Sequence, residues 1–253
     1  MINKLLNIVY NASEHGRSVD HMLEFCHWFM LILLVGWGTF LTIAIYRFRA
    51  SRNPKADYHG ITGHASSHAE FSVVLIEAAL LLGFAIPLWG KRVIEAPEQG
   101  EALRVRAIGE QYAWNFHYPG PDGRFGRQKA SLVSGSNPLG LDPEDEDSKD
   151  DVISKNELFA VNQRPVVVEI TSKDVIHAVS IKHMRIAQDA IPGTKVPVWF
   201  RPVKSGKYEI VCAQLCGGGH YAMRSHLIVD TQEKFDAQLS ELSQMQHPAA
   251  PAK

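Results

Sequence analysis

The sequence predicts two membrane-spanning helices followed by an all-β domain, and three observations support this fold class. Two long apolar runs, separated by a short basic connection, lie within the first 92 residues. From about residue 100 onward, short segments in which apolar and polar residues alternate are separated by turn residues. The length of 253 residues leaves room for one sizeable domain beside the helices.

The first apolar run extends from about residue 25 to 46 without a charged residue, and the second, from about 71 to 90, contains only Glu77. A helix needs about 20 such residues to cross a bilayer. A buried core helix is the alternative for each run, but two runs of this length close together favour a transmembrane helical hairpin at residues 25–92. The polar to mixed tail at residues 1–24 lacks the apolar core and cleavage site of a signal peptide.

Basic residues are concentrated between the two predicted spans. The connection carries four of them, at positions Arg47, Arg49, Arg52 and Lys55, whereas the preceding tail carries only Lys4 and Arg17. Because basic loops remain in the cytoplasm, the connection is expected there and both ends of the chain outside. The formal net charge of −1 gives no basic field that would attract nucleic acid.

The segment 95–230 is predicted to be a β-sandwich or barrel. Its expected strands lie at residues 103–108, 112–118, 165–171, 175–181, 196–200, 208–211 and 225–229. A polar insertion at 119–155 contains the acidic run 142–147, which is typical of a solvated loop; a calcium site and a docking patch for a basic partner are the alternatives.

The last part of the chain, residues 231–253, is predicted to be a helix followed by a loose tail. Asp230 is placed to cap this helix, with Glu233 three residues on as in a capping box, and the helix is expected to end near Gln244. The Pro/Ala-rich residues beyond it resemble a loose terminus.

Potential metal ligands are concentrated in one short stretch, which contains Cys212, Cys216, His220 and Met223, with His177 upstream as a fifth candidate. A Cys212–Cys216 disulfide would explain neither the histidine nor the methionine. Zinc accepts two cysteines and two histidines but leaves Met223 unused. Copper uses thiolate, imidazole and a weak axial thioether, and two copper ions can share both sulfurs with one histidine each. Cys26, in the first span, is expected only to pack there.

Residues 164–230 resemble the copper-binding domain of cytochrome c oxidase subunit II, in the haem–copper oxidase superfamily. The resemblance rests on the spacing of the two cysteines, histidine and methionine and on the upstream Asp-Val-Ile-His at 174–177. The order of tail, two spans and β domain extends it over nearly the whole chain. It implies a cupredoxin-like Greek-key barrel on the periplasmic, outer side of a bacterial-type plasma membrane.

The resemblance also implies a site that holds two copper ions, the CuA centre. Its side-chain ligands would be His177, Cys212, Cys216, His220 and Met223, and the backbone carbonyl of Gln214 would complete the set. The family commonly has glutamate at position 214, where the carboxylate helps to hold magnesium at the interface with the catalytic subunit. A neutral amide oxygen is a poorer ligand for a hard cation, which weakens the expectation of magnesium here. Asp189 matches a family loop that faces the catalytic subunit.

Electrons enter the family's site through an aromatic segment that resembles residues 109–118. Tyr112 occupies the place of the usual tryptophan, and Trp114 matches the next one along. Lys173 stands beside Asp174, where the family often has an acidic residue for docking a basic cytochrome. Both departures weaken the inference that the donor is an ordinary basic cytochrome c.

Two carboxylates belong to the second span. Glu70 lies at its cytoplasmic start and fits the position from which the family feeds protons to the catalytic subunit; Glu77 lies two turns deeper. A carboxylate at membrane depth is costly and therefore indicates a function, although an interfacial charge is an equal alternative for Glu70.

The resemblance implies the electron-accepting subunit of a respiratory terminal oxidase. A cytochrome c-type donor would reduce the copper pair, which would pass electrons to haem in the catalytic subunit, where oxygen becomes water and protons are pumped. The chain has no residues for oxygen chemistry of its own and no Cys-x-x-Cys-His motif for haem c. The alternative is a membrane-anchored copper-binding or delivery module. Two other classes of protein share parts of this pattern and are disfavoured. A quinol oxidase subunit has the same fold but lacks the copper ligands. A nitrous oxide reductase shares the copper motif but has a catalytic domain and not two membrane spans.

Overall fold

The computed structural model describes residues 2–55, 58–59, 63–98 and 100–247, which fall into two compact units. A helical unit comprises residues 1–8 and 18–94, and a β unit comprises residues 9–17 and 95–253. The structure confirms the predicted class of two long apolar helices followed by an all-β domain.

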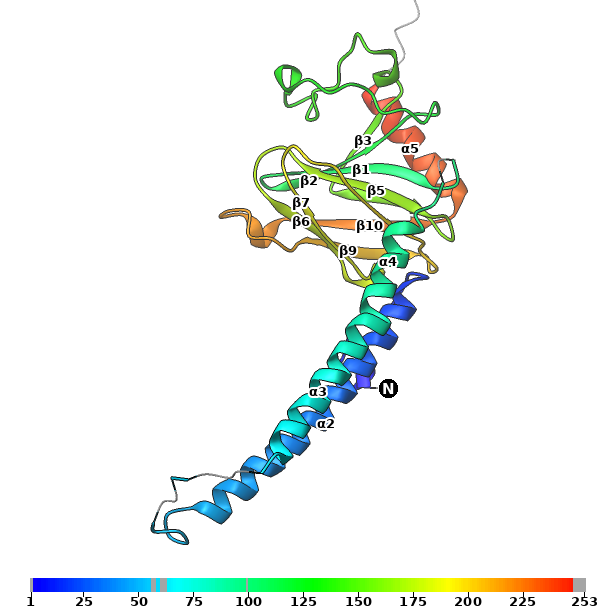
Figure 1. Ribbon diagram of the computed structural model, residues 1–253. Coiled ribbons are helices and arrows are strands. Elements are labelled where there is room, and N and C mark those ends of the chain that lie inside the picture. Colours follow the sequence, from blue (N-terminus) through cyan, green and yellow to red (C-terminus); the bar gives the residue numbers. More distant parts are fainter. Residues whose placement is uncertain (1, 56–57, 60–62, 99, 248–253) are drawn as a thin grey trace, which may run out of the picture. The chain divides into compact units, whose positions relative to one another are not determined.

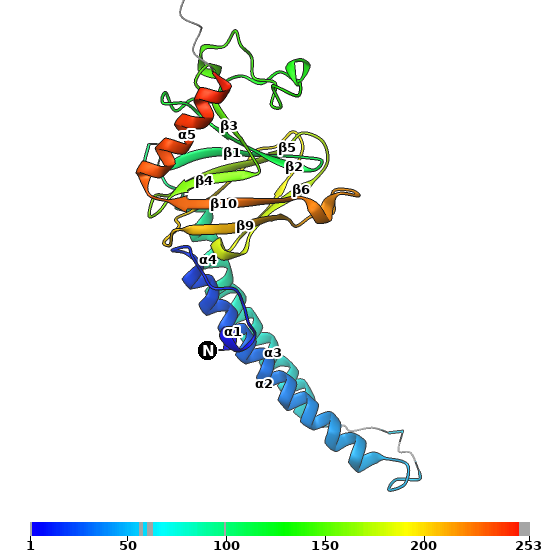
Figure 2. The same ribbon diagram turned by 180° about the vertical axis from the view of Figure 1, so that it is seen from behind.

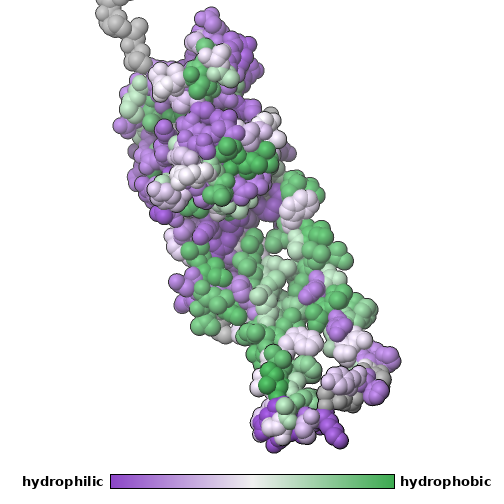
Figure 3. All heavy atoms as spheres, turned by 90° about the vertical axis from the view of Figure 1, so that its left-hand side faces the viewer, coloured by the Kyte–Doolittle hydropathy of each residue, from purple (hydrophilic) through white to green (hydrophobic). Residues whose placement is uncertain are grey.

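The helical unit consists of two long helices that lie side by side (Figures 1 and 2). After the short α1 (Ile2–Leu5), the first long helix is α2 (Gly16–Phe48). The second begins as α3 (Ala65–Leu80) and ends as α4 (Ile86–Ile94). Their most apolar stretches are 0% buried, and Figure 3 shows a nearly continuous hydrophobic surface along them. Such a surface requires lipid or partner helices instead of water.

A π-helical turn, η1 (Leu81–Ala85), joins α3 to α4, and its last hydrogen bond runs from the N–H of Ile86 to the carbonyl of Leu81. Pro87 follows directly and has no N–H to donate to the carbonyl of Gly83 four residues earlier. The wider turn accommodates this missing bond without breaking the helix.

The β unit is a sandwich of two five-stranded sheets. The first has the order β3-β2-β1-β5-β8 and the second β4-β10-β9-β6-β7. Their bounds are β1 Leu103–Glu110, β2 Ala113–Tyr118, β3 Val152–Lys155, β4 Glu157–Val161, β5 Val166–Ser172, β6 His177–Ile181, β7 Ile186–Ala190, β8 Val196–Phe200, β9 Gly206–Cys212 and β10 Arg224–Asp230. Large side chains from both sheets meet in one core, among them the fully buried Trp114, Phe116, Phe200 and Tyr208.

Three strands, β3, β4 and β7, lie outside the predicted set. Strand β3 takes the last four residues of the predicted insertion 119–155. Strand β6 begins at His177, two residues later than predicted, because Val175 and Ile176 belong to an exposed loop. The remaining predicted segments coincide with strands to within about two residues.

Most residues of the insertion are at least partly exposed, as expected of a solvated loop, but its acidic run begins with a buried residue. Asp142 is only 1% exposed, and its carboxylate accepts hydrogen bonds or ion pairs from Arg127 and Lys129 at 2.9 and 2.7 Å. Two basic side chains therefore neutralise this aspartate inside the fold. His117 and Asp151 are fully buried and joined at 2.6 Å on the side of β2 that faces away from the core.

Part of the predicted N-terminal tail belongs to the β unit. The N–H of Ala12 donates to the carbonyl of His183 at 2.8 Å, and the N–H of Val203 donates to the carbonyl of Ala12 at 2.8 Å. Ser13, 1% exposed, donates its hydroxyl to the carbonyl of Met184. The chain is thus fixed to the β sandwich immediately before α2 begins.

The C-terminal helix α5 (Gln232–Gln246) begins one residue later than the predicted cap implies. Thr231, not Asp230, is the N-cap: its hydroxyl accepts from the N–H of Lys234 at 3.5 Å. Asp230 still pairs with Val161 in the ladder between β10 and β4, so its backbone is unable to leave the strand. Phe235 anchors the helix to the core.

Candidate metal centre

The predicted ligands come from two neighbouring strands and the loop between β9 and β10. His177 is the first residue of β6 and Cys212 the last of β9, and these strands pair so that Val179 lies opposite Cys212. Cys216 lies in the loop, followed by His220 in the short helix η5 (His220–Ala222) and by Met223. Sheet pairing thus brings together residues 35 positions apart.

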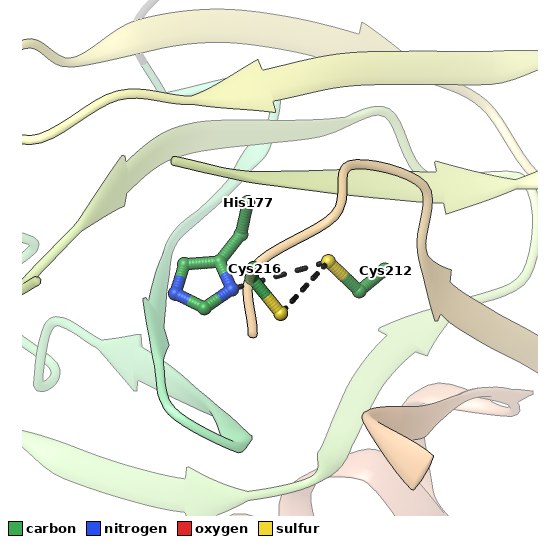
Figure 4. A group of neighbouring side chains, drawn as sticks. All are labelled: His177, Cys212 and Cys216. Atoms are coloured by element: carbon green, nitrogen blue, oxygen red, sulfur yellow. Dashed lines mark hydrogen bonds between the residues drawn. The ribbon is translucent and has the colours of Figure 1, made fainter. Parts of the chain in front are cut away.

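The ligand-type atoms of His177, Cys212 and Cys216 all lie within 4.8 Å of one another (Figure 4). The sulfur of Cys212 is 3.9 Å from the sulfur of Cys216 and 3.9 Å from Nδ1 of His177. The Cys216 sulfur lies 3.6 Å from Nδ1 of His220 and 3.8 Å from the Met223 sulfur. Each sulfur therefore has an imidazole of its own.

Both site cysteines are free thiols. Their separation of 3.9 Å is far longer than a disulfide bond of about 2.05 Å, but shorter than two metal–thiolate bonds of about 2.3 Å each. A metal ion can thus contact both sulfurs at once, and the residues present fit a metal. Burial, and after it the neighbouring Cys212, raises the pKa of the Cys216 thiol to about 11. Metal binding must therefore displace thiol protons.

Met223 and Gln214 lie where additional ligands are expected. Met223 is 1% exposed, with its thioether directed at Cys216. The carbonyl oxygen of Gln214 lies 3.2 Å from the Cys212 sulfur, while its side chain is exposed. The thioether favours a soft metal over zinc, which draws its ligands from Cys, His, Asp and Glu.

Two residues that the sequence analysis did not assign to the centre hold its ligands in place. Asp174 accepts a hydrogen bond from Nε2 of His177 at 2.8 Å, which leaves Nδ1 toward the sulfurs. Burial alone would raise the pKa of Asp174, but the hydrogen bond of His177, followed by the N–H groups of Gln111 and Val175, outweighs it and lowers the pKa. In the sequence, the spacing of three residues between Asp174 and His177 could have identified the contact between them, whereas no sequence pattern identifies Gln111 as a partner of the centre.

The predicted electron-input residues both reach the site. The Trp114 ring is fully buried and meets the His177 ring edge-on, with centroids 5.8 Å apart. Tyr112 is 42% exposed and lies against the ligand loop, so closely that a Cβ on Gly219 would be 2.5 Å from its ring. One aromatic ring is thus inside and the other at the surface.

The other predicted functional residues are not among the ligands, although Asp189 lies on the strand that pairs with His177. Asp189 is exposed on β7 opposite Ala178, next to the pair formed by His177 and Ala190. Glu70 and Glu77 are exposed on α3, seven residues apart and hence on one face of that helix. Cys26 is a free, partly exposed thiol in α2.

Comparisons with known proteins identify the family of this chain. The family described as cytochrome c oxidase subunit II, periplasmic domain, matches residues 103–232, just over half of the chain. An alternative cytochrome c oxidase subunit 2 from Bradyrhizobium diazoefficiens is 28% identical over 227 residues, which are 88% of this chain and 79% of that protein. A cytochrome c oxidase subunit 2 from Thermostichus vulcanus is 37% identical over 141 residues, 54% of this chain and 33% of that protein.

Among solved structures, the periplasmic domain of cytochrome oxidase subunit II from Bradyrhizobium japonicum is 26% identical, covers 59% of this chain and 97% of that chain, and has a TM-score of 0.44. The family match alone extends across every strand of the β unit and all the predicted copper ligands. This chain belongs to the cytochrome c oxidase subunit II family.

Proposed function

We propose that this chain accepts electrons for a respiratory terminal oxidase through a dinuclear copper centre. Membership of the family makes it a subunit of a haem–copper oxidase complex. The observation that carries the proposal is the pairing of each sulfur with its own imidazole, Cys212 with His177 and Cys216 with His220. One tetrahedral metal would not need Met223 as well, whereas two copper ions use the whole set.

The chain's own residues give the centre its properties. Two copper ions, when bound, supply a one-electron carrier whose electron is shared through both sulfurs. Asp174 orients His177, the buried Met223 provides a weak ligand, and the Gln214 carbonyl provides another. Because the ligands are held by strands and a hydrogen-bonded loop, little has to move when an electron arrives.

Electrons are proposed to arrive through Tyr112 and Trp114 from a cytochrome c-type donor. Tyr112 is exposed and packs on the ligand loop, so a donor that contacts its ring comes close to the centre. Trp114 packs against His177 from the interior. The ion pair of Lys173 with Glu110 neutralises charge beside the site, which reduces the attraction for a basic donor.

The catalytic subunit is proposed to supply the haem and the oxygen chemistry. Asp189 is a candidate contact for it, since the residue is exposed on the strand beside β6. The neutral amide of Gln214 is a weak candidate for a magnesium ligand. Glu70 and Glu77 are proposed to line a proton path in the assembled complex. Replacing each by glutamine should slow turnover in at least one variant, while unchanged oxygen consumption in both would remove this role.

The topology proposed from the sequence is supported by the fold of the β unit. Ala12 and Ser13 are bonded to the β sandwich, so the segment before α2 must lie on the same side of a membrane as the β domain. Two membrane crossings satisfy that condition, because the second returns the chain to the side from which the first began. The basic residues Arg47 and Arg49 then favour a cytoplasmic connection and a β domain on the outer side.

Stopped-flow reduction of the assembled oxidase, with a reduced c-type cytochrome as donor, tests the function. We expect the copper absorbance to change as fast as the donor haem is oxidised, and before the haem of the catalytic subunit is reduced. A copper-delivery module would instead release its copper to an acceptor and show no reduction on this timescale. The whole chain is required, because residues 9–17 complete the β unit.

A further inference from the structure

One residue is hydrogen-bonded to both segments that carry the ligands. Gln111 lies in the two-residue turn between β1 and β2. Its backbone N–H donates to Oδ2 of Asp174 at 2.7 Å, and its side-chain Nε2 donates to the carbonyl oxygen of Cys216 at 2.6 Å. Gln111 therefore bridges the loop before β6 and the loop after β9.

On the histidine side, the bridge acts through Asp174. The other carboxylate oxygen of Asp174 accepts from Nε2 of His177 at 2.8 Å and from the N–H of Val175 at 2.6 Å. With Nε2 occupied, the ring presents Nδ1 to the Cys212 sulfur. The Gln111 backbone thus helps to fix the carboxylate that orients this imidazole.

On the cysteine side, the bridge acts through the backbone. Gly217 follows Cys216 with φ at +132°, a conformation that favours glycine. A Cβ at Gly217 would lie 2.8 Å from the Gln111 amide nitrogen and 2.7 Å from the Tyr112 hydroxyl. The absent side chain lets Gln111 reach the Cys216 carbonyl, and this contact fixes the loop that carries the second sulfur.

We propose that Gln111 is a positioning residue that sets the distance between His177 and Cys216, and thereby the geometry of the copper pair. This inference rests on the proposed dinuclear centre and adds a residue to it. Gln111 is not among the predicted ligands: its Nε2 donates to the Cys216 carbonyl and its N–H to the Asp174 carboxylate. Its effect on the metals passes entirely through Asp174 and Cys216.

The test compares Gln111→Met with wild type in the whole chain within the assembled oxidase. Methionine has a similar length but no donor, so the bond to the Cys216 carbonyl is lost while all ligands remain. We expect two copper atoms per chain, an altered hyperfine pattern in the EPR spectrum, and copper loss to a chelator about fivefold faster, as the loss of one hydrogen bond implies. Gln128→Met, at an exposed position in the insertion, is the matched control and should match wild type.

A double-mutant cycle with Asp174→Asn tests whether the contacts of Gln111 and Asp174 act together on the centre or independently. If Gln111 and Asp174 act together, the double variant loses copper more slowly than the product of the two single effects predicts. Simple multiplication of the two effects would overturn the proposal, as would a Gln111→Met spectrum and copper-loss rate equal to those of wild type. If Gln111→Met fails to accumulate, Gln111→Asn keeps an amide one methylene shorter, and the same readouts apply to it.

The wild-type spectrum keeps this result distinct from the function itself. A wild-type chain without two copper atoms and a shared-electron signal would defeat the proposed function, whatever Gln111 does. A normal wild-type signal that is unchanged in Gln111→Met would defeat only the positioning role.

Discussion

The two halves of the candidate centre are held in different ways. His177 is the first residue of β6 and Cys212 the last of β9, and they are 0% and 7% exposed. The pairing of the two strands positions both residues. Cys216 and His220 lie on a loop whose neighbours Leu215 and Tyr221 are 80% and 81% exposed. The strand half depends on the fold, whereas the loop half depends on a few contacts from outside the loop.

This difference shows which changes will alter function without unfolding the domain. A substitution in the loop half removes ligands or contacts, and although Cys216 belongs to the core cluster, the largest members of that cluster, such as Trp114, Phe200 and Tyr208, are unchanged. The loop half also faces outward, where a partner can reach it. Substitutions there test the centre most cleanly.

The largest effect is expected for Cys216→Ser. Loss of one sulfur removes the atom that lies near both His220 and Met223, so the EPR signal of an electron shared over two coppers should vanish completely. Circular dichroism should still report a folded β domain. Cys26→Ser, in α2, is the matched control and should keep the full signal; a shared-electron signal that survives in Cys216→Ser would mean that this sulfur does not join the metals.

A smaller effect is expected where Tyr112 rests on the loop. In Gly219→Ala the new Cβ would lie 2.5 Å from the Tyr112 ring, so the ring or the loop must move. We expect reduction by the donor to slow about tenfold, since small displacements of reacting groups cost rate steeply. Stopped-flow absorbance measures this rate.

Gly218→Ala is the control for that prediction. Apart from its two chain neighbours, no heavy atom of the described residues lies within 4 Å of a Cβ at Gly218, so the change should leave the rate at its wild-type value. Equal rates in both variants would show that the Tyr112 contact with the loop does not matter for electron input.

Most strands of the β unit could be predicted from the sequence, because apolar and polar residues alternate along them. Strand β4 was missed since Leu158 to Val161 form an unbroken apolar run that is buried throughout, without alternation. Strand β7 was missed because Gln188 and Asp189 interrupt its apolar pattern at an edge of the sheet. Neither failure affects the class of the fold, because both strands add to sheets whose other members were recognised.

The close approach of the ligands could also be predicted, since Cys212, Cys216 and Met223 are near in sequence. The contacts that hold them could not. Gln111 reaches Cys216 across 105 residues, and only the packing of the two sheets brings them together. The burial of Asp142 depends likewise on Arg127 and Lys129, which no local pattern identifies.

A still smaller effect is expected for Met223→Leu. Leucine fills the buried space but has no sulfur, so the metals lose a weak donor that stabilises the more positive, oxidised state. We expect both copper atoms to remain and the reduction potential to rise, as measured by redox titration of the visible absorbance. Met184→Leu, a fully buried methionine that is not a predicted ligand, should leave the potential unchanged; a fall or no change in Met223→Leu would argue against the thioether as a ligand.

The smallest effect is expected in the scaffold, for Glu169→Gln on β5. Glu169 pairs with Arg106 at 2.9 Å and Arg104 at 2.5 Å on the outer face of its sheet. Burial alone would raise the pKa of Glu169, but the hydrogen bond and charge of Arg106, then those of Arg104, hold its pKa below the usual value. The free energy of unfolding should fall by about 1 kcal/mol at pH 7, without a change in the copper signal.

The pH dependence of this effect has a definite sign. A depressed pKa in the folded state gives stability that is present above the unfolded pKa of about 4.3 and disappears as the pH falls through the lower folded value. Denaturant titration should therefore show a difference between Glu169→Gln and wild type at pH 7 that shrinks near pH 3. Glu209→Gln, whose partner Arg224 is exposed at 3.6 Å, should change stability less at either pH; an equal loss in both variants would contradict a special role for the Glu169 pairs.

The central claim is that both halves together hold two copper ions. Metal analysis and EPR spectroscopy on the same purified sample of the whole chain test it most directly. We predict two copper atoms per chain and a spectrum in which one unpaired electron couples equally to both nuclei. A single bound metal ion, zinc in place of copper, or a disulfide between Cys212 and Cys216 in the active complex would contradict it.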